Sequence, residues 1–374
     1  MTFWRDSRVR IYGPLGGETS WSRVARGLYL GLQAWRPADF FKTDDIGHSI
    51  DTPLRSGDDN EIGLFVGAPN RAGMMLGQGS HQERWLMLAP NSSWLPRDVL
   101  FELERVQAVT GYLSPSNWGV EQVRRYTDLP VRCFPHGVDT EHLPLVDEEY
   151  PPPPPKGSFR VLHLSSTHLD RKGTQQLVEA WTMAMLEKQI PPDAQLSLVL
   201  DGPGAFVTQA CRQTLSRITR KQTGLWDEVE RTINIMPRLN LDPPGLAKLM
   251  QEHHCVCQPS RAEGFGMVPL EARAVGVPVI MTDGTGHGMH VPRTNAVAHG
   301  VCVVHQSGHH PINDGPNATA PRFDTMQLVD ALTDVCFDAL RYRQLARRRA
   351  PQVRREWSWQ ERARVFLGEE DRDG

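Results

Sequence analysis

Strand-length apolar runs alternate with helix-length segments along most of this 374-residue chain. In the first half, the sequence predicts strands at 9–12, 61–66, 84–89, 109–113 and 131–134 and helices at 20–34, 96–107 and 117–126. In the second half, it predicts strands at 159–164, 195–200, 232–236, 255–258 and 277–281, with helices that include 174–186 and 243–252. Such alternation favours parallel, doubly wound sheets with helices on both faces. We therefore expect an α/β fold whose ligands bind at the carboxyl ends of strands.

Five consecutive prolines, Pro151 to Pro155, separate the two sets of runs. Proline cannot donate a sheet hydrogen bond and favours a stiff, extended spacer, so this run predicts a linker. A polyproline ligand for another protein is the alternative interpretation. The chain length suits two domains. We expect an N-terminal domain at 1–150, a second domain at 151–355 and a C-terminal helical segment at 356–374.

Composition is typical of a soluble globular protein, with 39% hydrophobic and 23% charged residues. The net charge of −3 gives no overall attraction for nucleic acid or anionic membranes. No apolar run approaches the ~20 residues of a membrane span, and the first residues do not form a signal peptide. Six scattered cysteines fit a reducing compartment, so we expect a cytoplasmic protein. Cys255 and Cys257 suggest a metal site, but their alternation favours a strand with both thiols on one buried face.

The segment from Pro259 to Ala272 carries the strongest chemical signal in the chain, because it follows one predicted strand and opens a helix. Gly264 and Gly266 flank Phe265 and allow the backbone to approach a ligand closely. The amides and the positive end of the following helix favour a phosphate. Glu263 and Glu271 are then positioned to bind hydroxyls at opposite ends of one elongated ligand.

This segment resembles the E-x7-E signature of retaining glycosyltransferases of the GT-B architecture, which have two Rossmann-like domains facing a cleft. In that family the first Glu and the Gly-Phe-Gly amides hold the transferred sugar, and the second Glu holds the ribose. The resemblance assigns sugar contacts to Glu263, Gly264, Phe265 and Gly266 and the ribose contact to Glu271, and Met267 is a further expected donor contact. Four further segments are similar to family elements, namely Arg171-Lys172-Gly173, Pro135 to Asp139, Ser114 to Trp118 and Trp357 to Gln360.

The resemblance implies that the lysine of the Lys-Gly element, here Lys172, pairs with the donor diphosphate. The family places Gly-Arg before that element, whereas this chain has Ser166-Thr167. Arg171 either supplies the missing charge or is a solvated loop residue, and both readings stay open. We also assign donor contacts to Gly16 and Gly17, in the glycine turn after the first strand, and to Thr167 and Pro237. Asn91 and His81 are the acceptor-site candidates.

Histidines gather between residues 287 and 310, after the strand that follows the E-x7-E helix. His287 and His290, in a glycine-rich loop, are positioned to bond phosphate or acceptor. His299, His305, His309 and His310 follow, but the spacing fits no compact zinc pattern, and polar surface histidines are the favoured interpretation. We expect no metal and no cofactor, with a nucleotide sugar as substrate.

The expected reaction transfers a hexose from a nucleoside diphosphate, with UDP-glucose as the family default and GDP-mannose as its rival. The expected acceptor is a saccharide or a lipid-linked saccharide. Charge on the leaving diphosphate would be stabilised by Lys172, Arg171 and the helix amides.

DNA is an alternative acceptor, because there are seven arginines in the run from Arg341 to Arg355. In addition, Trp94 and Trp118 are available to stack on bases. A solvated helix face is the favoured reading of that run. A non-catalytic nucleotide-sugar binder is a further alternative, and a dinucleotide-dependent oxidoreductase is disfavoured because no G-x-G-x-x-G follows the first strand.

Overall fold

The computed structural model describes most of the chain and divides it into two compact units. The described residues are 7–14, 20–43, 61–67, 81–145, 159–165, 169–200, 212–214, 216–218, 223–237, 241–312 and 315–369, together with Trp4, Pro69 and Gln209. Unit 1 comprises Met1–Asp139 and Arg354–Gly374, and unit 2 comprises Thr140–Val353. The proline run at 151–155, proposed as the linker, lies outside the described residues.

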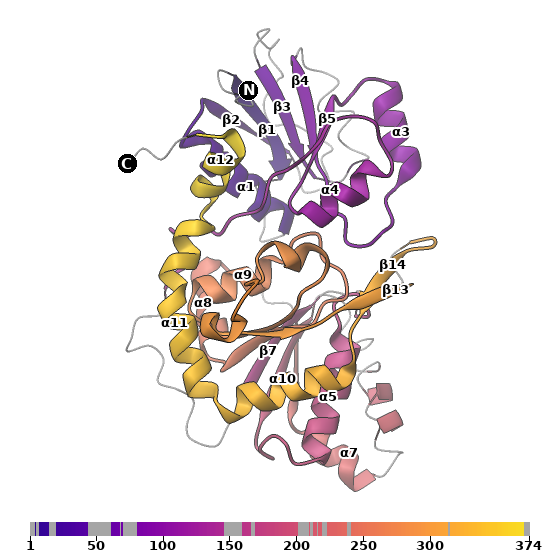
Figure 1. Cartoon of the computed structure of the whole chain (residues 1–374), viewed down its shortest axis with the longest axis vertical. Helices are drawn as coiled ribbons and strands as arrows, with labels where there is room; N and C mark the ends of the chain where they lie inside the picture. Colours follow the sequence, from indigo (N-terminus) through magenta and orange to yellow (C-terminus); the bar gives the residue numbers. More distant parts are fainter. Residues whose placement is uncertain are drawn as a thin grey trace. The chain divides into compact units, whose positions relative to one another are not determined.

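Unit 1 contains a six-stranded sheet in the order β2-β1-β3-β4-β5-β6, with each strand parallel to its neighbours. Its strands are β1 (Arg8–Pro14), β2 (Ala38–Thr43), β3 (Glu61–Val66), β4 (Glu83–Met87), β5 (Gly111–Ser114) and β6 (Val131–Cys133). Its helices are α1 (Ser20–Gln33), α3 (Arg97–Arg105), α4 (Asn117–Arg124) and α12 (Trp359–Leu367). Figure 1 shows α1 and α12 on one side of this sheet and α3 and α4 on the other.

The sequence pattern explains why these helices pack as they do. Val24, Leu28 and Leu32 recur every four residues on one face of α1 and are buried. The Ser116 hydroxyl accepts a hydrogen bond from the Gly119 amide at 3.0 Å and caps α4. The Ser358 hydroxyl caps α12 in the same way, accepting from the Glu361 amide at 3.1 Å.

Helix α12 packs on α1 through Trp359, which is 4% exposed. A Cβ on Gly27 would lie 2.0 Å from Trp359 Cε2, and one on Gly31 would lie 2.5 Å from the Trp359 carbonyl oxygen. Glycine at these two positions therefore permits the helices to approach closely. Val138 also forms a parallel bridge with Ser358, and its amide donates to the Trp357 carbonyl at 2.7 Å.

Unit 2 contains a second parallel six-stranded sheet, in the order β12-β11-β10-β7-β8-β9. Its strands are β7 (Arg160–Ser165), β8 (Gln195–Leu200), β9 (Ile233–Pro237), β10 (Cys255–Gln258), β11 (Val279–Thr282) and β12 (Val301–Val304). An antiparallel hairpin, β13 (Ser307–Pro311) and β14 (Thr319–Arg322), follows β12. The helices are α5 (Thr174–Leu186), α7 (Thr223–Glu230), α8 (Pro243–Gln251), α9 (Met267–Ala274), α10 (Thr325–Phe337) and α11 (Ala339–Glu356), with 3₁₀ turns η1 (Thr285–Met289) and η2 (Ala296–His299).

The main core of unit 2 lies between its sheet and helices α5 and α10, and Figure 1 shows α8 and α9 on the opposite side. Cys255 and Cys257 both belong to this core, which confirms that the two thiols share a buried face of one strand. The predicted α/β class and its two parallel sheets are confirmed. Strand β2, strand β12 and the β13–β14 hairpin were not predicted from the sequence.

Candidate functional site

Three neighbouring strands of unit 2 end beside the predicted donor motif. Strands β11, β10 and β7 are adjacent in the sheet, and all run parallel. The segments that leave their carboxyl ends contain Arg171-Lys172, the Glu263-Gly264-Phe265-Gly266 motif and the loop at 283–290. The motif therefore lies at the carboxyl ends of the strands, where parallel α/β sheets usually bind their ligands.

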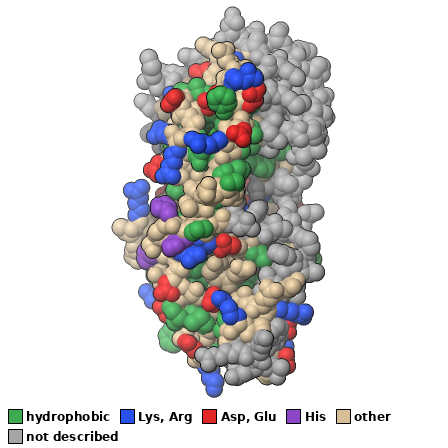
Figure 2. Space-filling model, turned by 90° about the vertical axis from the view of Figure 1, so that its right-hand side faces the viewer, with side chains coloured by type: hydrophobic (Ala, Val, Ile, Leu, Met, Phe, Trp, Pro, Cys, Tyr) green, Lys and Arg blue, Asp and Glu red, His purple; other side chains and the backbone are tan. Residues whose placement is uncertain are grey.

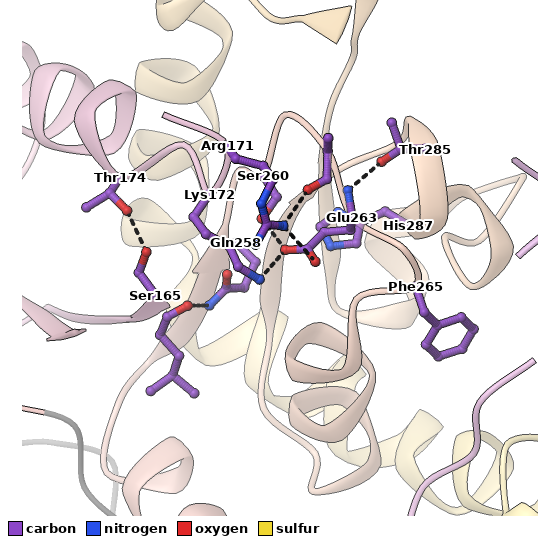
Figure 3. Close-up of polar contacts among 12 residues, drawn as sticks. Ser165, Arg171, Lys172, Thr174, Gln258, Ser260, Glu263, Phe265, Thr285 and His287 are labelled. Carbon is purple, nitrogen blue, oxygen red and sulfur yellow. Dashed lines mark hydrogen bonds and ion pairs between the residues drawn. The ribbon is translucent and has the colours of Figure 1, made fainter. Parts of the chain in front are cut away.

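Lys172 and Glu263 form the centre of this site (Figure 3). The Lys172 Nζ donates to Glu263 Oε1 at 2.5 Å, and the Ser260 hydroxyl donates to the same oxygen at 2.9 Å. Arg171 Nη1 lies 3.6 Å from the other carboxylate oxygen. The structure thus brings together Lys172 and Arg171, which the sequence analysis assigned to the leaving diphosphate, and Glu263, which it assigned to the transferred sugar.

The Glu263 carboxylate is ionised over the physiological range. Burial alone raises the pKa of Glu263, because its side chain is only 10% exposed. The Lys172 and Arg171 cations outweigh that effect and hold the pKa of Glu263 at about 2. A permanent carboxylate beside two cations is suited to accept hydrogen bonds from ligand hydroxyls and to anchor a cation that also binds phosphate.

Arg171 is 6% exposed, so it is not the solvated loop residue that one reading of the sequence allowed. Its Nη1 donates to the Ala262 carbonyl at 3.0 Å, and its own carbonyl accepts from the Arg261 amide at 2.8 Å. Arg171 therefore links the two loops that carry Lys172 and Glu263.

The glycines of the motif shape the start of α9. Gly266 is the N-cap residue and has φ +90°, a conformation that favours glycine. The first amides of α9 and the positive end of its dipole are next to Gly266, so an anion is stabilised there. Glu271, the fifth residue of α9, is 5% exposed. Figure 3 shows Phe265 directed away from the Lys172–Glu263 pair.

Arg261 is a buried residue beside the donor motif to which the sequence gave no role. Its Nη1 lies 2.7 and 2.8 Å from the two carboxylate oxygens of Asp170, next to Arg171 in the chain. Its other guanidinium nitrogens donate to the Pro311 and Pro321 carbonyls of the hairpin at 3.2 and 3.3 Å. One buried guanidinium therefore joins the loop after β7, the loop after β10 and the β13–β14 hairpin. The sequence shows an arginine inside the motif. The residues that it binds are distant in the chain, so its contacts could not be predicted from the motif.

The loop at 283–290 packs against the donor motif and is hydrogen-bonded to it. The Gly286 amide donates to the Glu263 carbonyl at 2.8 Å, and the Glu263 amide donates to the Thr285 hydroxyl at 3.1 Å. His287 and His290 are buried, so the prediction of surface histidines was wrong for these two. It was wrong because the loop folds back as η1 and packs both rings under Gly264–Gly266. His305 and His309 are exposed, as predicted.

The remaining predicted contacts are not gathered in the same place. Gly16, Gly17 and Thr167 lie outside the described residues. Pro237 ends β9, which β8 separates from β7. Asn91 is exposed, four residues beyond the carboxyl end of β4, whereas His81 is buried before its amino end. His81 Nε2 lies 2.9 Å from the Tyr12 hydroxyl within the core. The structure therefore does not bring His81 and Asn91 together.

The arginines of α11 are largely engaged within unit 2 or are partly covered. Arg343 is buried and donates to the Gln251 carbonyl at 2.9 Å. Arg341, Arg348 and Arg355 are exposed and lie seven residues apart on one helix face, and Arg341 pairs with Asp338 at 3.1 Å. A solvated helix face fits the exposed positions of Arg341, Arg348 and Arg355, and DNA binding gains no support from them. Figure 2 displays the side of the protein that is at the right in Figure 1, away from α11, and acidic and basic side chains are interspersed on that face.

Among the helices that the structure describes, none has the length and apolar character required to cross a bilayer. Among the same residues, no group of three or more His, Cys, Asp or Glu side chains is arranged to hold a metal ion.

Solved structures share this fold. Sucrose-phosphate synthase from Thermosynechococcus elongatus aligns with a TM-score of 0.63 and 16% identity, covering 97% of each chain. WaaG, a glycosyltransferase involved in lipopolysaccharide biosynthesis, aligns with a TM-score of 0.57 and 13% identity, covering 96% of this chain and 100% of its own. The chain has the GT-B fold of these glycosyltransferases.

The sequence comparisons define the family. Residues 119–366 match the family described as "Family 4 Glycosyltransferase in conflict systems", and the chain belongs to this family. A D-inositol 3-phosphate glycosyltransferase from Jonesia denitrificans is 34% identical over 128 residues, which are 34% of this chain and 26% of the relative. A GDP-mannose-dependent monoacylated alpha-(1-6)-phosphatidylinositol monomannoside mannosyltransferase from Corynebacterium glutamicum is 25% identical over 319 residues, covering 80% of this chain and 71% of the relative.

Proposed function

We propose that this chain transfers a hexose from a nucleoside diphosphate to an acceptor hydroxyl and retains the anomeric configuration. One observation carries the proposal: Lys172, Arg171 and Glu263 meet beside the amino end of α9, at the carboxyl edge of a parallel sheet. This arrangement offers cations and helix amides for a diphosphate and a carboxylate for sugar hydroxyls. Glu271, further along α9, is the candidate for the ribose.

In this mechanism the protein acts mainly on the charge of the leaving group. Negative charge builds on the diphosphate as the bond to the anomeric carbon breaks. Lys172 would exchange part of its bond with Glu263 for the phosphate oxygens, while the α9 amides bind the same group. The acceptor would attack from the face that the diphosphate leaves, and a phosphate oxygen would take the acceptor proton. No protein nucleophile and no metal are required.

UDP-glucose and GDP-mannose are the two donors that we propose to test first. UDP-glucose follows from the resemblance of the motif to its family. GDP-mannose is supported by the Corynebacterium glutamicum relative, which is named as GDP-mannose-dependent. A saccharide or a lipid-linked saccharide is the proposed acceptor, because the two relatives above are named for inositol phosphate and phosphatidylinositol mannoside acceptors. Asn91, exposed beyond β4, is the candidate acceptor contact in unit 1.

A thermal-shift panel of nucleotide sugars tests the proposal. A ligand that binds the folded state stabilises it by RT ln(1 + [L]/Kd), about 2.7 kcal/mol when its concentration is 100 times Kd. We expect one nucleotide sugar to raise the unfolding temperature by several degrees and to be hydrolysed slowly when no acceptor is present. A panel without any stabilising nucleotide sugar contradicts the proposal. Tight binding without hydrolysis or transfer supports a non-catalytic binder instead.

A further inference from the structure

His163, a residue of β7, is hydrogen-bonded through one of its ring nitrogens to the neighbouring strand β10. Its Nδ1 lies 2.8 Å from the Cys257 carbonyl oxygen. A carbonyl oxygen can only accept, so Nδ1 carries a proton and donates it. Burial lowers the pKa of His163 to about 4, so the ring is neutral at pH 7 and Nε2 carries a lone pair. The tautomer of His163 is therefore set by a group that has no proton of its own.

The directions of two further hydrogen bonds follow from this tautomer. Nε2 of His163 lies 2.9 Å from the Thr174 hydroxyl oxygen, so that hydroxyl donates to it. The Ser165 hydroxyl lies 2.9 Å from the same oxygen (Figure 3), and it is the donor because the Thr174 proton is already used. Thr174 is 1% exposed, and its hydroxyl is held in one orientation by His163 on one side and Ser165 on the other.

Thr174 is the first residue of α5, and only Gly173 separates it from Lys172. Gly173 has φ +70°, a conformation that favours glycine. A Cβ on Gly173 would lie 2.0 Å from the Pro259 carbonyl oxygen, so this turn packs tightly against the start of the donor motif. A shift of Thr174 would therefore move the backbone of Lys172 along the donor motif.

The same imidazole is bonded to the strand that leads into the donor motif. Cys257 is the third residue of β10, and Glu263 follows it by six residues. One ring thus joins the strand that leads to Glu263 and the helix that begins just after Lys172. The distance between these two segments determines where Lys172 Nζ lies relative to Glu263 Oε1, which is 2.5 Å away.

We infer that His163 and Thr174 are positioning residues that hold the Lys172 ammonium where the donor diphosphate binds. This inference rests on the proposed function. Both side chains are buried, at 0% and 1% exposed, so neither contacts the diphosphate. Their effect on the diphosphate passes through Lys172.

Two substitutions at Thr174 separate hydrogen bonding from packing. Thr174→Val preserves the branched shape but cannot donate to His163, whereas Thr174→Ser retains the hydroxyl and loses a methyl group. With UDP or GDP, whichever binds more tightly, we expect Thr174→Val to raise Kd roughly fivefold and Thr174→Ser to raise it less than about twofold. The rate of sugar transfer should fall in the same order. An unchanged Kd in Thr174→Val overturns the inference.

Thr182→Val is the matched control in the same helix. Thr182 is fully buried, and its hydroxyl donates to the Val178 carbonyl at 2.7 Å. Both valine substitutions therefore remove a buried hydrogen bond from α5, but Thr182 is distant from Lys172 in the helix. We expect Thr182→Val to leave Kd for the nucleotide within about twofold. An equal rise in Kd in the two valine variants would attribute the loss to a weaker helix and overturn the inference.

A double-mutant cycle tests whether Thr174 acts through Lys172. In a Lys172→Ala protein the cation to be positioned is absent, so adding Thr174→Val should change Kd by less than about twofold. A roughly fivefold loss in both backgrounds overturns the inference, because Thr174 then acts independently of Lys172. A wild-type protein that binds neither UDP, GDP nor a nucleotide sugar contradicts the proposed function. Independent losses in a protein that does bind them contradict this inference alone.

A measurement on the unmodified protein covers the case in which Thr174→Val does not fold. With ¹⁵N-labelled histidine, two-bond ¹H–¹⁵N spectra show which ring nitrogen is protonated, and the His163→Gln variant identifies the His163 signals by their loss. We expect a ring protonated at Nδ1 and unprotonated at Nε2 at pH 7, both with and without bound nucleotide. A ring protonated at Nε2 overturns the inference, because Thr174 could not donate to it.

Discussion

The Lys172 Nζ lies 2.5 Å from Glu263 Oε1, although the two residues are 91 positions apart in the chain. One comes from the loop after β7 and the other from the loop after β10, which are neighbouring strands. The pair therefore depends on the parallel sheet for its geometry. It also leaves Lys172 held at the position where the diphosphate is proposed to bind.

Replacing Lys172 with alanine tests that role. We expect Lys172→Ala to lower the rate of sugar transfer by about 10²–10³-fold, because the cation that stabilises the leaving group is lost. Acceptor binding should change much less. Single-turnover kinetics with the donor identified in the panel give the rate. Lys248→Ala, at an exposed lysine of α8, is the matched control, and an unchanged rate in Lys172→Ala contradicts the assignment.

Glu271→Ala should weaken donor binding through the nucleotide and not through the sugar. We expect Kd to rise about tenfold for both the nucleotide sugar and the corresponding nucleoside diphosphate, since the ribose is common to both. Calorimetric titration measures the two constants. The control is Glu252→Ala, at an exposed residue that follows α8. An effect on the nucleotide sugar alone would place Glu271 at the sugar instead.

Arg261→Lys should loosen the hairpin as well as the loop after β7. A lysine ammonium cannot reproduce the planar set of bonds to Asp170 and to the carbonyls of Pro311 and Pro321. We expect a loss of about 1–3 kcal/mol in the free energy of unfolding. Hydrogen exchange of the β13–β14 amides should accelerate at the same time. Arg293→Lys, at an exposed arginine, should change neither quantity.

Gly31→Ala should destabilise unit 1. The new Cβ would lie 2.5 Å from the Trp359 carbonyl oxygen, a backbone atom that cannot rotate away. We expect unfolding to become easier by about 1–3 kcal/mol, measured by urea denaturation. Gly224→Ala in α7 is the opposite case, because nothing lies within 4 Å of its new Cβ and alanine favours a helix. Equal destabilisation by both substitutions would show that the contact with Trp359 is not the cause.

Stability should fall as the pH decreases from about 6.5 to about 4, because buried histidines stay neutral in the folded state. His163 is a clear case. Its Nδ1 donates to the Cys257 carbonyl at 2.8 Å, its Nε2 lies 2.9 Å from the Thr174 hydroxyl, and burial lowers its pKa to about 4. Below pH 6.5 the unfolded chain binds a proton that the folded chain does not, so acid favours unfolding.

The His163→Gln variant lacks the contribution that protonation of His163 makes to the pH dependence of unfolding. The slope of the unfolding free energy against pH should become smaller by up to about 1.4 kcal/mol per pH unit between pH 6.5 and 4. Urea titrations at several pH values measure the slope. A slope identical to that of the wild-type protein would contradict the neutral, buried assignment.

The sequence predicted well those elements whose pattern is local. Strands β8 and β10 and helix α5 were predicted with their observed ends, because each has a strong apolar pattern bounded by polar or proline residues. The hairpin was missed because β13 reads Ser307-Gly308-His309-His310-Pro311, with no β-branched residue. Its folding depends on Ile312, Ala318 and Ala320 packing with Ala262. That contact is not visible in a local pattern.

The same distinction applies to the site. Glu263 and Lys172 were predicted from motifs, and the structure places them in contact. No role for Arg261 could be predicted from the motifs. Arg261 acts through Pro311, Pro321 and Asp170, which lie 50 to 91 positions away in the chain. Such roles are set by the directions of hydrogen bonds, which residue spacing does not encode.

The packing of Trp359, in α12, against α1 has a consequence for folding during synthesis. Unit 1 needs residues after 354 to cover Gly27 and Gly31, whereas unit 2 is one continuous stretch. During synthesis from the amino end, unit 2 can close its core while the α12 surface of unit 1 is still bare. Unit 1, most of which leaves the ribosome before unit 2, is therefore the unit that finishes folding last.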